Sequence, residues 1–132
     1  MDKMPTWKEI EDREREVAEE TELTRAVLVR VLGGVPFEPG ERVRYRLADG
    51  TVDNIFHARL RWLEHTDGAL ALVKDQGLRV VISDGRDGQR WGVGLFGGGR
   101  TGGAEHTSLP RAIIEALLCW QDKAQANTES EA

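Results

Sequence analysis

The sequence predicts an α+β protein in which a small antiparallel sheet packs with helices in a layered sandwich. An apolar, β-branched run at 78–82 precedes a polar turn, and Trp91, Val93 and Leu95 alternate with Gly92, Gly94 and Phe96 after it, which indicates a hairpin with one buried face. Apolar residues recur with helical spacing from Leu109 to Trp120, so an amphipathic helix is expected to lie across that sheet. A capped and strongly charged segment at the start of the chain indicates a further helix.

Composition limits the class of protein. A chain of 132 residues is long enough for one domain with a hydrophobic core. Cys119 is the only cysteine, which excludes an internal disulfide and favours a reducing compartment. The chain has no run of about 18 apolar residues and no apolar signal segment after its charged N-terminus. We therefore expect a cytoplasmic protein without a membrane partner.

Residues 1–20 are predicted to form an acidic N-terminal helix or arm. Thr6 and Glu9 have the spacing of a capping box. Residues 1–22 contain nine acidic and four basic side chains, whereas the remainder of the chain contains fourteen of each. The apolar face of this helix is thin, which favours a solvated or half-exposed packing helix and leaves open a partner-binding or dimerising one. The candidate protein-interface residues are Trp7, Ile10 and Val17.

Residues 21–123 are predicted to form a single α+β domain. Leu23 to Val31 can continue the first helix, which the pair Gly33 and Gly34 would end. Residues 27–31 are also rich in β-branched side chains, so a strand remains an alternative for this segment.

Residues 35–62 stand out as an arginine-bearing insertion in that domain. Residues 42–47 alternate as a strand would, and Asp49-Gly50 is a hairpin turn signal before a return strand at Thr51-Val52. Residues 59–62 alternate in the same way. If these strands are neighbours, five arginines share one surface, which is either the solvated face of a half-buried sheet or an anion-binding patch. The candidate anion-binding residues are Arg42, Arg44, Arg46, Arg59 and Arg61.

The second half of the chain supplies the predicted layers. A short helix capped by Thr66 or Asp67 is expected to end at Gly77, and the hairpin with its turn at 84–88 follows. Residues 97–103 contain five glycines but neither phosphate-binding pattern, so we interpret them as a flexible connection. Ser108 should cap the C-terminal helix, and residues 124–132 are predicted to be a fraying polar tail.

Three segments of this half resemble the phage ABA sandwich domain. They are His-Thr-Asp-Gly-Ala-Leu-Ala-Leu-Val at 65–73, Arg-Trp-Gly-Val-Gly-Leu at 90–95 and Leu-Pro-Arg-Ala-Ile-Ile-Glu-Ala-Leu-Leu at 109–118. Leu23 to Gly33 is similar to that family's first helix. The resemblance covers residues 21–122 and departs from the family at the insertion. It implies a layered α+β fold and a bacteriophage or prophage origin, and it brings no active site with it.

No arrangement of residues indicates catalysis. His57, His65 and His106 lack the spacing of metal ligands, Cys119 has no Cys-x-x-Cys partner, and the nucleophile elbow is missing. We expect no catalytic residue, no metal and no cofactor. The sequence favours a small phage or prophage accessory protein in the host cell cytoplasm, which acts as a non-enzymatic protein-interaction module on a host or phage protein. Binding of nucleic acid or a nucleotide by the arginines, a small enzyme and a homo-oligomer remain open alternatives.

Overall fold

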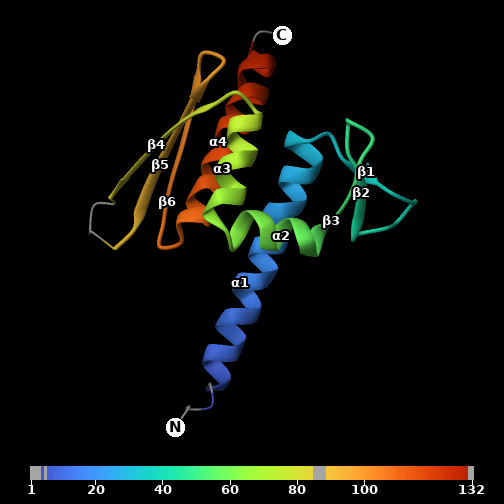
Figure 1. Cartoon of the computed structure of the whole chain (residues 1–132), viewed down its shortest axis with the longest axis vertical. Coiled ribbons are helices and arrows are strands. Elements are labelled where there is room, and N and C mark those ends of the chain that lie inside the picture. The colour runs from blue at the N-terminus through green and yellow to red at the C-terminus, as the bar shows by residue number, and fades with distance from the viewer. Residues whose placement is uncertain (1–3, 5, 85–88, 131–132) are drawn as a thin grey trace.

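The computed structural model describes residue 4, residues 6–84 and residues 89–130, with side chains as far as residue 123. These residues form helices and two three-stranded antiparallel sheets, which confirms the α+β class (Figure 1). The helices are α1 (Trp7–Ala26), the π-helical segment η1 (Val27–Val31), α2 (Ile55–Leu63), α3 (Thr66–Asp75) and α4 (Leu109–Ser130). The strands are β1 (Val35–Pro36), β2 (Arg44–Arg46), β3 (Val52–Asn54), β4 (Arg79–Asp84), β5 (Trp91–Gly97) and β6 (Arg100–His106).

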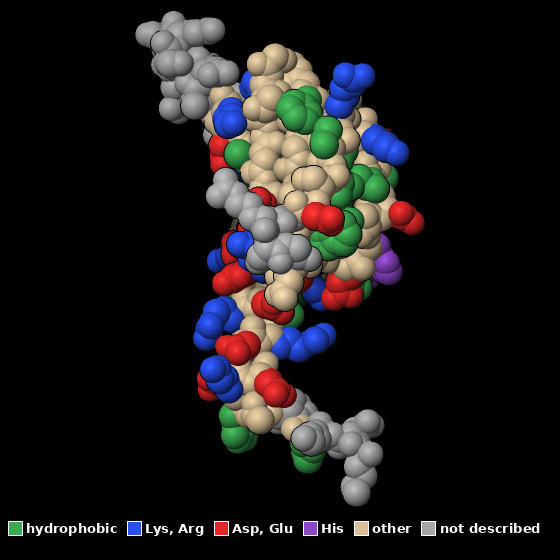
Figure 2. Space-filling view, turned by 90° about the vertical axis from the view of Figure 1, so that its left-hand side faces the viewer, with side chains coloured by type: hydrophobic (Ala, Val, Ile, Leu, Met, Phe, Trp, Pro, Cys, Tyr) green, Lys and Arg blue, Asp and Glu red, His purple; other side chains and the backbone are tan. Residues whose placement is uncertain are grey.

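The larger sheet has the order β4-β5-β6, and α4 packs against one of its faces (Figure 1). Val93 and Leu95 of β5 are buried, while Phe96 near the end of the same strand is exposed, as expected for a strand with one buried face. The predicted hairpin and the predicted C-terminal helix on the sheet are therefore confirmed. Figure 2 looks onto the other face, where backbone and polar side chains surround scattered hydrophobic ones.

The prediction of a flexible connection at residues 97–103 is wrong. Gly98 and Gly99, with φ of 60° and 75°, form a tight turn between β5 and β6, because glycine tolerates the left-handed region. Gly102 lies within β6, where a Cβ atom would be 2.5 Å from the amide nitrogen of Trp120 in α4. The indole N–H of Trp120 donates a hydrogen bond to the carbonyl oxygen of Gly97 at 2.9 Å. The glycines thus permit close contact between the sheet and α4.

The segment at 27–31 is helical, so the strand alternative is excluded. The amide of Leu32 donates to the carbonyl oxygen of Val27 at 3.1 Å, which is the i to i+5 spacing of a π-helix. Val27 and Leu28 are completely buried, so tertiary packing compensates for the modest helix propensity of valine. Gly33, with φ of 66°, follows the end of the helix as predicted.

The smaller sheet has the order β1-β2-β3 and lies beside the C-terminal part of α1 (Figure 1). Tyr45 of β2 is buried, and its hydroxyl oxygen accepts a hydrogen bond from Nε of Arg25 in α1 at 3.0 Å. Gly50 has φ of 90° in the predicted turn, and the Asp49 carboxylate accepts a hydrogen bond from the amide of Thr51 at 2.9 Å. Hydrogen bonds from the Thr51 side chain and amide lower the pKa of Asp49.

The prediction of a strand at 59–62 is wrong, because these residues belong to α2. The side chain of Asn54 caps this helix by accepting a hydrogen bond from the amide of Phe56 at 2.8 Å. Ile55, Ala58 and Trp62 recur with helical spacing and are buried. The next helix, α3, begins at Thr66 without a side-chain N-cap bond, so the predicted cap at Thr66 or Asp67 is not formed.

The C-terminal helix begins where it was predicted to begin but ends later. The hydroxyl oxygen of Ser108 accepts a hydrogen bond from the amide of Arg111 at 3.4 Å, which agrees with the predicted cap. The helix continues to Ser130, so most of the backbone that we predicted as a fraying tail is helical. Of the predicted turn at 84–88, only Asp84 is among the described residues. Within the described residues, none of the helices combines the length and apolar character needed to cross a membrane.

One hydrophobic core joins the elements. Ile113, Ile114 and Leu117 of α4 are completely buried and lie in one cluster with the first helix, α2, α3 and β5. The domain predicted from residue 21 onward therefore includes the end of α1 and the segment η1, where Thr24 and Val27 are completely buried.

Candidate protein-interaction surface

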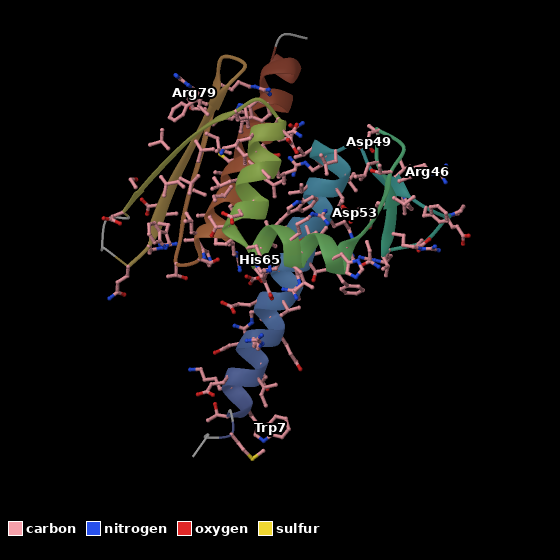
Figure 3. All side chains as sticks on the ribbon, in the orientation of Figure 1. Trp7, Arg46, Asp49, Asp53, His65 and Arg79 are labelled. Atoms are coloured by element: carbon pink, nitrogen blue, oxygen red, sulfur yellow. The ribbon has the colours of Figure 1, made fainter. Side chains whose placement is uncertain are left out.

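The first half of α1 extends beyond the body of the protein (Figure 1). We define the N-terminal arm as Trp7–Ala18, in which every residue is exposed except the half-buried Ile10. Trp7 is 81% exposed and lies at the free end of the helix (Figure 3). The boundary predicted at residue 20 falls inside one continuous helix, at the point where that helix leaves the body.

The predicted capping box holds the beginning of the arm. The Thr6 hydroxyl oxygen accepts a hydrogen bond from the amide of Glu9 at 3.2 Å, and the Glu9 carboxylate accepts one from the amide of Thr6 at 3.2 Å. Asp12 and Arg15 form an ion pair at 3.7 Å. Helices shorter than about 12 residues are marginal when isolated, so the capping box and the anchored second half of α1 both support the arm.

Ile10 and Val17 lie on one side of the arm, two helical turns apart, and a shallow hollow separates them. We call this side the arm face. Its lining residues are Glu9, Ile10, Asp12, Arg13, Glu14, Glu16 and Val17. The same helical spacing continues to Thr24 and Leu28, which are completely buried in the body. The arm face is therefore an uncovered extension of the surface that packs into the core.

A second surface feature is a groove of about 950 Å³ between α1 and α4. Its apolar lining residues are Ala18, Leu23, Ala26, Leu118 and Cys119. Two ion pairs lie along the groove, Arg30 with Asp122 and Arg111 with Glu19. Cys119 is half-buried in this groove.

Two ion pairs lie at the junction between the arm and the body. Arg111 of α4 donates a hydrogen bond to Glu19 at 2.8 Å, and Arg59 of α2 lies 3.7 Å from Glu20. The hydrogen bond and charge of Arg111 lower the pKa of Glu19. Burial raises the pKa of Glu20, because the loss of solvation outweighs the charge of Arg59. Burial and the charge of Arg111 both lower the pKa of nearby His106.

The ion pair between Glu19 and Arg111 should make the stability of the fold depend on pH. Because the pKa of Glu19 is lower in the folded state, its carboxylate stabilises the fold above the unfolded-state pKa, and this stabilisation is lost as the pH falls through the folded-state pKa. Glu19→Gln should therefore lower the melting temperature near neutral pH but not in strong acid. Thermal unfolding from strong acid to neutral pH measures the melting temperatures of the variant and the wild type. Glu11→Gln on the exposed arm is the control, and an equal pH dependence in both variants would contradict the assigned role of Arg111.

The structure does not bring the five candidate arginines together on one sheet. Arg59 and Arg61 lie on α2, whereas Arg44 and Arg46 lie on β2 and Arg42 precedes that strand. Arg59 is only 16% exposed at its side chain and forms ion pairs with Glu20 and Glu64. Figure 3 shows Arg46 on the smaller sheet, on the opposite side of the molecule from Arg79.

Most of these guanidinium groups form ion pairs with carboxylates or lie over an aromatic ring. Arg61 forms an ion pair with Asp53 at 2.6 Å, and Arg44 forms one with Glu41. Arg44 and Arg46 also lie over the ring of Phe37, at 4.6 and 5.2 Å from its centroid. Among the five arginines, Arg42 and Arg46 lack a carboxylate partner within the part of the chain described. An anion-binding patch therefore stays a prediction from the sequence.

The three histidines belong to different segments, with His57 in α2, His65 just before α3 and His106 at the end of β6. Among the described side chains, no group of three or more His, Cys, Asp or Glu is arranged to hold a metal ion. Sequence reasoning identified the apolar residues of the arm but missed Arg111, whose contact with Glu19 spans 92 positions of the chain. No local spacing signals such a contact.

Comparison of the chain with protein-family models, with curated proteins and with solved structures finds no match. The resemblance to the phage ABA sandwich domain thus depends on the sequence segments alone.

Proposed function

We propose that the chain is a small phage or prophage accessory protein that acts as a non-enzymatic protein-interaction module, with the N-terminal arm as its docking element. The observation that carries this proposal is Trp7, which is 81% exposed at the tip of a capped helix that extends beyond the body. Ile10 and Val17 add apolar surface along the same helix.

Binding physics favours such an element. Tryptophan is enriched among the residues that dominate the energy of protein interfaces, because its large side chain gains much from burial. An amphipathic helix commonly binds in a groove of its partner through apolar residues on one side. The arm is already helical in the free chain, so it loses less conformational entropy on binding than a disordered segment would.

The phage part of the proposal is supported by the three sequence segments that resemble the phage ABA sandwich domain. They fall on α3, on β5 and on α4, which belong to one hydrophobic core. The arm lies outside those segments. The proposed partner is accordingly a host or phage protein, and the body serves as the scaffold that presents the arm.

Affinity capture from a nuclease-treated bacterial lysate tests the proposal. The wild-type chain should retain at least one protein that a Trp7→Ser/Ile10→Ser variant loses, because the variant removes apolar contacts without changing the charge. A Val35→Ser/Val52→Ser variant is the control, since it makes the same kind of change at exposed positions of the smaller sheet. Retention of the same proteins by all three chains, or of none by the wild type, would refute the docking role of the arm.

A further inference from the structure

We infer that the arm face binds a basic amphipathic segment of a partner protein, a helix whose apolar side chains are flanked by lysine or arginine. This inference rests on the proposed docking function of the arm and names the chemistry of its partner.

The charge of the arm face favours a cationic partner. Four carboxylates and one guanidinium group line the hollow beside Ile10 and Val17, and two of these carboxylates already have partners, Glu9 in the capping box and Asp12 in its ion pair with Arg15. The carboxylates belong to Glu9, Asp12, Glu14 and Glu16. Within the part of the chain described, neither Glu14 nor Glu16 has a hydrogen-bond or ion-pair partner. An excess of unpaired carboxylates attracts a cationic partner and repels an anionic one.

The spacing of the apolar residues on the arm favours an amphipathic helix as the partner. Ile10 and Val17 are seven positions apart, so about 10 Å of helix separates them. A partner helix alongside the arm presents apolar residues with that same repeat of seven. Trp7 lies three positions before Ile10 and extends the line of apolar contacts toward the tip. Burial of these apolar side chains supplies most of the free energy of binding, because exposed ion pairs contribute little.

The same features disfavour other occupants. Nucleic acid and anionic lipid surfaces carry the same sign of charge as the arm face. A second copy of the arm would place its carboxylates against those of the first, which costs free energy. A basic amphipathic segment satisfies both the charge and the apolar spacing.

Fluorescence anisotropy with a labelled synthetic helix of lysine and leucine tests the inference on the full chain. The leucines recur at i, i+3, i+7 and i+10, and lysines occupy the other positions. A peptide of equal composition with its leucines scrambled tests the need for an apolar side, and a glutamate and leucine peptide tests the need for positive charge. We expect the ordered lysine peptide to bind at least about tenfold more tightly than either control.

Variants of the arm separate the two contributions. Ile10→Ser/Val17→Ser should weaken binding about tenfold, because it removes the apolar contacts and keeps every charge. Glu14→Gln/Glu16→Gln should weaken binding about fivefold, with a smaller effect at high salt. Its matched control is Glu38→Gln/Glu105→Gln, which changes the net charge equally at two exposed positions outside the arm, and which should weaken binding by no more than about twofold.

Equal affinity for the ordered and scrambled lysine peptides would overturn the inference, as would equal effects of the two charge variants. Preferential binding of the glutamate peptide would also overturn it. None of these results would remove the proposed docking function, which fails only if arm-dependent capture of a protein is not observed. The two claims can therefore fail separately.

Discussion

Gly102→Ala is expected to destabilise the fold by about 3 kcal/mol, because the added methyl group has no space. Its carbon atom would lie 2.5 Å from the backbone nitrogen of Trp120 and 2.7 Å from the carbonyl oxygen of Ala116. These atoms belong to the backbone of α4, so a rotation of one side chain cannot relieve the contact. Either α4 or β6 must move, and that movement disturbs the packing of the sheet on the helix.

Urea-induced unfolding, followed by circular dichroism, measures this loss as a lower midpoint with an unchanged slope. Gly103→Ala is the matched control, since Gly103 follows Gly102 in β6 and its nearest atom is a carbonyl oxygen at 3.3 Å. That variant should lose clearly less free energy of unfolding. Equal losses in the two variants would show that α4 does not approach β6 as closely as described.

Leu117→Ala is expected to cost about 3 kcal/mol, because Leu117 is completely buried at the centre of the apolar side of α4. The loss combines the transfer of the missing side-chain atoms to water with the cavity that remains. Leu60→Ala is the matched control, because Leu60 lies in α2 and is 41% exposed. Its replacement should cost less than about 1 kcal/mol. Comparison of the two unfolding midpoints decides whether α4 forms the core.

The elements that could be predicted from the sequence are those with long or chemically specific patterns. The apolar stripe of α4 extends over three turns, so only a helix accounts for it. The capping box at Thr6 and Glu9 combines two residue types at a fixed spacing, and the structure contains both of its hydrogen bonds. The hairpin of β4 and β5 was predicted from a β-branched apolar run before a polar turn and from alternation after it.

The wrong predictions came from short patterns that fit two structures. Arg59 to Trp62 alternates over only four residues, and the helical spacing of Ile55, Ala58 and Trp62 becomes visible only in a longer window. The glycines of 97–103 suggested a flexible connection because sequence does not show that α4 lies against β6. Tertiary contact, rather than local propensity, determined both segments.

In the candidate site, too, residues with a local pattern could be predicted, whereas those that depend on tertiary contacts could not. Trp7, Ile10 and Val17 were predicted as a thin apolar face, and the structure places them on an arm that no described element covers. The arginines were grouped on the assumption of neighbouring strands, which α2 does not satisfy. Arg111 could not be identified, because its role depends on how α1 crosses α4.

Site-specific photocrosslinking of the full chain in bacterial cells tests the docking role of the arm most directly. A benzoylphenylalanine side chain would replace Val17 on the arm face in one chain and Val52 on β3 in another, both of which are exposed hydrophobic positions. We expect a discrete crosslinked product from the Val17 position that Trp7→Ser/Ile10→Ser abolishes, and none from the Val52 position. The absence of a product at Val17, or the same products from both positions, would contradict the account.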